Sequence, residues 1–193
     1  MNATTRNDYE KVIKSLNISM DSEEKCIDVY HKNNWDRFTM HFCEETENKC
    51  PSYIDFFFDA KEMVDFLKTF IEKGKFEKCY VASRYNGRYK LKFIDDDVCK
   101  DIYDEFKKLL NSLGLKINTS CAIEMDKTEI LNWCDRISIG AFSGVSEYVI
   151  VIPELEIIIN PHHHMNYLIY SNNTEELFTK IAVDISGEIA CYY

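Results

Sequence analysis

Apolar residues recur at helical spacing in several segments of the chain. Near the N-terminus, Tyr9, Val12, Ile13 and Leu16 follow the i, i+3, i+4, i+7 pattern of one helix face, which predicts a short helix over residues 7–16. Longer helices are expected where capping residues precede such a pattern and a glycine follows it. These further helices are predicted at residues 61–73, after the cap Asp59, at 98–113 and 127–134, and from the cap Asn172-Asn173-Thr174 to about residue 184.

Runs rich in β-branched and aromatic residues alternate with the helical segments. The dipeptide Asn86-Gly87 lies between two such runs and is the strongest hairpin signal in the chain. The runs Phe56-Phe57-Phe58 and Ile157-Ile158-Ile159 do not alternate with polar residues, so they are expected in central strands that are buried on both sides. Strands are predicted at residues 26–31, 37–42, 53–58, 77–83, 89–94, 148–159 and 167–170, and at the edge of the sheet at 187–193.

Three strands lead directly into a capped amphipathic helix, starting at Tyr53, Tyr89 and Tyr167. The hairpins between them imply antiparallel pairing with helices on one side of the sheet. The predicted fold class is therefore α+β, a mostly antiparallel sheet with helices packed on one face, in three strand-pair-then-helix units. A length of 193 residues with only 6 Gly and 3 Pro predicts a single domain over 1–193, with a division into 1–116 and 117–193 as the alternative.

Charge is distributed unevenly. The formal net charge is −10, which disfavours binding to nucleic acid and to anionic membranes and favours basic partners. Residues 137–193 hold seven acidic residues and a single basic one, Lys180. This segment is expected to form either a docking surface for a cationic protein or a solvated surface that only aids solubility.

The eight cysteines are expected to be reduced. The chain is large enough to fold without disulfides, no two cysteines form a C-x-x-C or C-x-C pair, and the N-terminus lacks the apolar core of a secretory leader. Cys79 lies among apolar neighbours, where cysteine behaves as a small core residue. No apolar run approaches 18 residues, so no transmembrane helix is expected and a cytoplasmic location is predicted.

A histidine run, Pro161-His162-His163-His164-Met165, is the one candidate metal site. On a strand, His162 and His164 would share a face, a spacing that metals can use. The alternatives are a polar turn between two strands and a histidine cluster within a binding loop. Neither zinc-protease histidine motif is present, and no cofactor is expected.

The remaining motifs do not indicate a catalytic or ligand-binding site. Arg84 and Arg88 flank Tyr85 on the predicted hairpin, but the surrounding chain is acidic and an edge-protecting hairpin explains them. Residues 95–97 are three aspartates that suit a helix cap. Ser143 lacks the spacing of a nucleophile elbow, and neither glycine-rich phosphate motif occurs. The sequence therefore favours a binding protein over an enzyme.

The leading hypothesis is a protein-binding inhibitor, an immunity or anti-defence protein that neutralises a basic nuclease or toxin through its acidic surface. The alternative is a metal-dependent enzyme that uses the His162–His164 loop, and a third reading is a scaffold protein that forms a homo-oligomer through an exposed strand edge. No motif assigns the chain to a family. The expected partner contacts are acids with neighbouring aromatic rings: Glu154, Glu156, Tyr167, Tyr170, Glu175 and Glu176.

Overall fold

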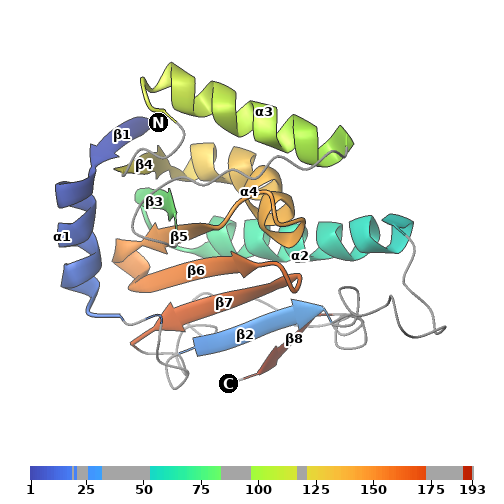
Figure 1. Cartoon of the computed structure of the whole chain (residues 1–193). Helices are drawn as coiled ribbons and strands as arrows, with labels where there is room; N and C mark the ends of the chain where they lie inside the picture. The colour runs from blue at the N-terminus through green and yellow to red at the C-terminus, as the bar shows by residue number, and fades with distance from the viewer. Residues whose placement is uncertain are drawn as a thin grey trace.

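The computed structural model describes residues 1–18, 20, 26–31, 53–83, 97–116, 121–172 and 189–192, and it gives only the backbone of residues 53–57, 98 and 192. These residues contain α-helices and strands that alternate along the chain (Figure 1). The helices are α1 (Arg6–Leu16), α2 (Tyr53–Lys73), α3 (Asp97–Ser112) and α4 (Lys127–Phe142). The strands are β1 (Asn2–Thr5), β2 (Cys26–His31), β3 (Lys78–Ser83), β4 (Cys121–Asp126), β5 (Tyr148–Ile152), β6 (Ile157–His162), β7 (Asn166–Ser171) and β8 (Ile189–Tyr192).

All strands described join one sheet in the order β1-β4-β3-β5-β6-β7-β2-β8. Every pairing in this sheet is antiparallel. The hairpins β5–β6 and β6–β7 are local, whereas β2 lies between β7 and β8, which follow it by more than a hundred residues. β8 lies at one edge, as the sequence predicted for the end of the chain.

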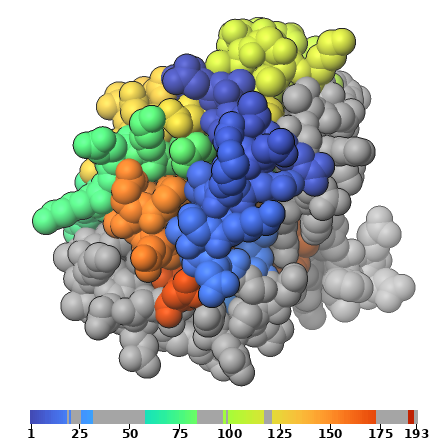
Figure 2. Space-filling model, turned by 90° about the vertical axis from the view of Figure 1, so that its left-hand side faces the viewer, coloured from blue at the N-terminus to red at the C-terminus, as the bar shows by residue number. Residues whose placement is uncertain are grey.

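Helices cover both faces of the sheet, but unequally. The larger core lies between the sheet and α2, α3 and α4, and it includes Phe70, Phe106 and Ile137. The smaller core lies on the other face, where α1 contributes Leu16 against Ala82, Val149 and neighbouring strand residues. Figure 2 looks at this second face and shows α1 (blue) lying across it, with part of the β5–β7 segment (orange) exposed beside it.

The predicted fold class is confirmed: the protein is α+β with an antiparallel sheet. Three helices share one face, and α1 adds a cover on the opposite face. The run Ile157-Ile158-Ile159 is a buried central strand as predicted, with at most 1% of each side chain exposed. β5 and β6 are buried along almost their whole length because both of their faces are covered.

The strand predicted at residues 53–58 is wrong, because these residues form the first turns of α2. Five of these six residues are apolar or aromatic, a composition that fits a strand or a buried helix equally well, and here the helical pattern that follows continues through them. Asp59, expected as a helix cap, lies inside α2, and Phe58 is 67% exposed rather than central in a sheet.

Several other boundaries also differ from expectation. The strand predicted at 148–159 is two strands, β5 and β6, separated by the 3-10 turn η3 (Pro153–Leu155), and the hairpin turn follows His162 instead of lying at Asn160-Pro161. The helix predicted at 127–134 continues to Phe142, and β1 and β4 were not predicted. The elements expected at residues 37–42 and 89–94, and the helix ending near residue 184, lie outside the described residues.

Buried cysteines contribute to the core. Cys79 and Cys134 are 0% exposed, and the Cys79 thiol donates a hydrogen bond to the Met125 carbonyl at 3.6 Å. Burial raises the pKa of the Cys134 thiol to about 12. These two side chains are therefore unreactive packing residues. Among the described helices, none has both the length and the apolar content needed to cross a membrane.

Candidate functional site

The turn between β5 and β6 presents two of the predicted contact residues to solvent. Glu154 and Glu156 are exposed, while Leu155 between them is 6% exposed and packs inward. A Cβ placed on Gly74 would lie 2.9 Å from Leu155 Cδ1, so this leucine docks closely against the end of α2. The Glu156 backbone has φ 55° and donates its N–H to the Pro153 carbonyl at 3.0 Å. The buried leucine and this hydrogen bond fix the direction in which the two glutamates project.

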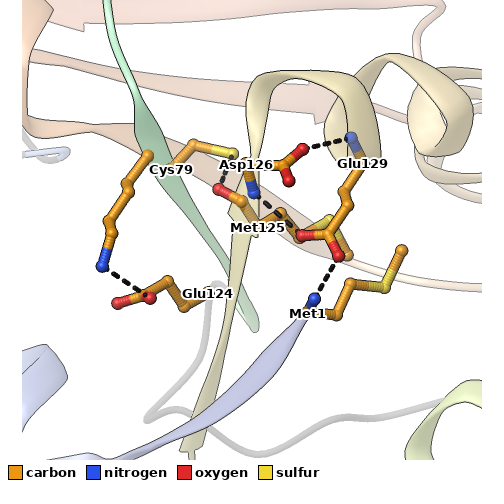
Figure 3. A network of polar contacts seen from close by, with 7 residues as sticks. Met1, Cys79, Glu124, Met125, Asp126 and Glu129 are labelled. Atoms are coloured by element: carbon orange, nitrogen blue, oxygen red, sulfur yellow. Dashed lines mark hydrogen bonds and ion pairs between the residues drawn. The ribbon is translucent and has the colours of Figure 1, made fainter.

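A network of polar contacts surrounds the neighbouring end of β4 (Figure 3). Lys78 Nζ pairs with Glu124 Oε1 at 2.9 Å across the β3–β4 ladder. Asp126 caps α4: its Oδ1 accepts the Glu129 N–H at 2.8 Å, and its own N–H donates to Glu129 Oε2 at 2.9 Å. The N-terminal ammonium of Met1 also pairs with Glu129. This capping box joins β1, β4 and α4 at one end of the sheet.

The charge of Glu154 also acts on two side chains of β3, Cys79 and Tyr80. Burial raises the pKa of the Cys79 thiol well above its ordinary range, and the charges of Glu154, Asp126 and Glu129 raise it further. Burial also raises the pKa of Tyr80, and the carboxylates of Glu124 and Glu154 add to that shift. The fields of these carboxylates therefore converge on β3.

Six carboxylates lie near one another at one end of the sheet, and we call them the acidic end. They lie just before β3, at the end of β4, in the first turn of α4 and around η3. Among the described residues, ion pairs occupy only Glu124 and Glu129, and Glu77, Glu154 and Glu156 are exposed with no cation paired to them. The acidic end consists of Glu77, Glu124, Asp126, Glu129, Glu154 and Glu156.

The two tyrosines predicted as partner contacts are inside the protein. Tyr167 is 0% exposed: its ring stacks on Phe66 at 6.2 Å between centroids, and its hydroxyl donates to Ser138 Oγ at 2.8 Å. Tyr170 is 4% exposed and belongs to the smaller core on the opposite face. Their assignment as surface contacts is wrong, because both side chains are used in packing. Glu175 and Glu176 lie outside the described residues.

The histidines meet at the tip of the β6–β7 hairpin. His162 is the last residue of β6, and His163, His164 and Met165 form the turn. Ring centroids are 4.0 Å apart for His162 and His163, 4.5 Å for His162 and His164, and 4.1 Å for His163 and His164. One nitrogen from each ring lies within 4.8 Å of the others. The structure thus brings together His162 and His164 as candidate ligands through a turn rather than a strand face, and it adds His163.

A polar row runs across three strands beside this hairpin. Asn166 is the register partner of His162, and its Nδ2 donates to Asp28 Oδ1 on β2 at 2.6 Å. Burial raises the pKa of Asp28, while the hydrogen bond from Asn166 partly opposes the shift. Sequence reasoning missed this pair because the two residues are 138 positions apart and meet only when β2 pairs with β7.

We expect Asp28→Asn to stabilise the protein at neutral pH. With a raised folded-state pKa, the stability that Asp28 contributes is complete below about pH 4, the ordinary pKa of an aspartate, and is lost as the pH rises through the folded-state value. Asparagine keeps an acceptor oxygen for Asn166 and carries no charge to bury. Urea unfolding at pH 3.5 and pH 7 measures both proteins, and the advantage of the variant should be present only at pH 7. An advantage that does not change with pH would contradict this assignment.

Two further polar arrangements are structural. His31 is 1% exposed and contacts Glu62 Oε2 through Nε2 at 2.8 Å and Asp59 Oδ2 through Nδ1 at 3.6 Å, which ties β2 to α2. Ser143, the C-cap of α4, donates its hydroxyl to the Ile139 carbonyl at 2.6 Å, so its side chain stabilises the end of the helix.

Helices α3 and α4 border an open groove of about 660 Å³. Arg136 spans it, pairing with Glu105 and lying 6.0 Å from the Trp133 ring centroid. Glu105 already pairs with Arg136, so this guanidinium is not free to bind an anionic ligand, and Lys108 is the other cationic side chain among the residues that line the groove.

Comparisons with family models, curated proteins and solved structures found no match for this chain. The acidic end and the histidine turn are therefore the two candidate sites from which a function can be inferred.

Proposed function

We propose that the protein is a binding inhibitor of the immunity or anti-defence type, which uses its acidic end to cover a basic nucleic-acid-handling enzyme or toxin. The observation that carries this proposal is the pair Glu154 and Glu156. Both are exposed on an anchored turn and have no cation paired to them among the described residues. Charged side chains that are fixed in place before binding accelerate association and set the register of a complex.

The surroundings of this pair support the same reading. Glu77 is exposed beside it on the approach to β3, and Lys78 is already paired with Glu124. An isolated acidic turn would bind a basic surface weakly because exposed ion pairs contribute only about 0–1 kcal/mol each. Several carboxylates at the same end of the sheet add their potentials, and the summed potential attracts a basic active site more strongly than one ion pair does.

We expect Glu154→Lys/Glu156→Lys to weaken binding to basic nuclease domains by about tenfold or more at low salt, since each reversal replaces attraction by repulsion. Calorimetric titration against a panel of catalytically inactivated nuclease domains of high pI, at 50 and 200 mM salt, measures the loss. Binding of the native protein should weaken at the higher salt concentration.

The matched control is Asp101→Lys/Glu147→Lys, which changes the net charge by the same amount. Asp101 lies in the first turns of α3, and Glu147 precedes β5 at the end opposite Glu154; both are exposed. This control should bind nearly as well as the native protein. Equal losses in both double variants would show that only net charge matters, and binding insensitive to salt would overturn the electrostatic proposal.

A further inference from the structure

We propose that His162, His163 and His164 together bind one late first-row divalent metal ion, such as Zn²⁺, at the tip of the β6–β7 hairpin. This site goes beyond the proposed inhibitory function and is separate from it. His162 and Ile157 are at opposite ends of β6, so about 17 Å of strand separates the histidine turn from η3. Figure 1 shows the two turns at opposite ends of the sheet.

The backbone of the turn is fixed before any ion arrives. Met165 donates its N–H to the His162 carbonyl at 3.0 Å and has φ 56°, the left-handed conformation that closes a three-residue hairpin loop. A non-glycine residue adopts this conformation at a cost of about 1–2 kcal/mol. Here the methionine side chain is 4% exposed and packs in the larger core, which offsets that cost. The turn therefore presents its histidines from a constrained backbone.

The spacing of the rings suits a shared ion. Three imidazole nitrogens bound tetrahedrally to zinc lie about 3.3 Å apart, because each Zn–N bond is about 2.0–2.1 Å. The candidate nitrogens already lie within 4.8 Å of one another, so small rotations of the side chains bring them to bonding distance. His163 is exposed and the other two are half-buried, so an ion reaches the site from solvent.

A second observation points to the same place. Asn166, directly across from His162, is 6% exposed, and its Oδ1 has no hydrogen-bond partner among the described residues. Asn160, two residues before His162 on the same sheet face, is 1% exposed, and its Nδ2 is likewise without a partner there. A buried polar atom without a partner costs about 1–3 kcal/mol. Water bound to the ion, or a ligand imidazole N–H, would donate to Asn166 Oδ1, whereas the Asn160 Nδ2 donor needs an acceptor such as a water oxygen.

The type of ion follows from the donors. Three neutral imidazoles favour zinc, nickel or copper over magnesium or calcium, which prefer oxygen ligands. Three protein ligands leave one tetrahedral position for water, the arrangement of open rather than closed zinc sites. The hydrogen bond from Asn166 Nδ2 to Asp28 orients the Asn166 amide and leaves its Oδ1 available as an acceptor. Asn166 is thus a positioning residue rather than a ligand.

Zinc titration of the full chain, purified without an affinity tag, tests the site. We expect one ion per chain, with His162→Ala and His164→Ala each lowering the affinity at least tenfold. Zinc should raise the melting temperature of the native protein and not that of the triple variant His162→Ala/His163→Ala/His164→Ala. Far-UV circular dichroism and urea unfolding verify that each variant is folded.

A free peptide with the sequence of residues 160–167 is the control for unstructured chelation. The folded protein should bind zinc at least tenfold more tightly than this peptide, because its turn is already formed. Asn166→Ala should lower the zinc affinity of the folded protein. The zinc-free variant should still fold, because the substitution removes only one buried hydrogen bond, that to Asp28. Equal affinity of peptide and protein, or unchanged affinity in the triple variant, would overturn the proposal.

Discussion

Tyr167→Ala is expected to lower the free energy of unfolding by about 3–5 kcal/mol, the range for removing a buried aromatic ring. Tyr167 is 0% exposed and contacts the rings of Phe66 and Phe142, at 6.2 Å and 5.5 Å between centroids. It therefore joins β7 to α2 and α4 within the larger core. Such a loss is a large share of the roughly 5–15 kcal/mol that stabilises a domain of ordinary stability.

The matched variant Tyr167→Phe separates the ring from its hydroxyl. It keeps the packing and removes one hydrogen bond to Ser138 Oγ, so a loss of about 1–2 kcal/mol is expected. Urea unfolding measures both variants. If Tyr167→Ala changed stability by less than about 0.5 kcal/mol, as surface substitutions do, Tyr167 would be a surface residue after all.

Phe106→Ala is expected to cost a similar amount, about 3–5 kcal/mol. Phe106 is 0% exposed and lies 4.6 Å from the Tyr148 ring centroid and 5.1 Å from that of Trp133. It is the aromatic side chain by which α3 is held against α4 and β5. Removing it leaves a cavity that these rigid neighbours fill only partly.

Phe58→Ala is the control for this second variant. Phe58 is 67% exposed on α2, so its removal should change the stability by less than about 0.5 kcal/mol. Comparing Phe58→Ala with Phe106→Ala also tests whether residue 58 lies in α2. If Phe58 lay in a central strand, its removal would cost as much stability as that of Phe106. Equal losses for the two variants would contradict the helical placement of residue 58.

Local patterns predicted elements whose ends carry clear signals. α3 begins and ends within one residue of its predicted bounds because its apolar stripe is regular and Gly114, at φ 69°, follows it. The start of α2 was missed because an aromatic run has no period of its own. β4 was missed because its burial arises from its place between β1 and β3. The side of the sheet that α1 covers is likewise a property of the assembled sheet.

In the candidate sites, too, some features could be read from local sequence and others depend on the assembled fold. The exposure of Glu154 and Glu156 agrees with their charge, but the turn that carries them lies inside a segment predicted as one strand. The burial of Tyr167 did not follow from the sequence, because a tyrosine beside acidic residues suits both an interface and a core. Convergence of the histidines depends on the left-handed Met165, and the Asp28–Asn166 bond depends on a pairing between distant strands. Neither can be read from spacing alone.

Inhibition of a basic nuclease is the measurement that tests the central claim most directly. The initial rate of substrate cleavage is recorded at rising concentrations of the native protein, of Glu154→Lys/Glu156→Lys and of Asp101→Lys/Glu147→Lys. We expect the native protein and the second variant to inhibit at similar concentrations, and the first variant to need about ten times more. Inhibition by all three at the same concentration, or by none of them across a panel of basic nucleases, would contradict the assignment of the acidic end as an inhibitory surface.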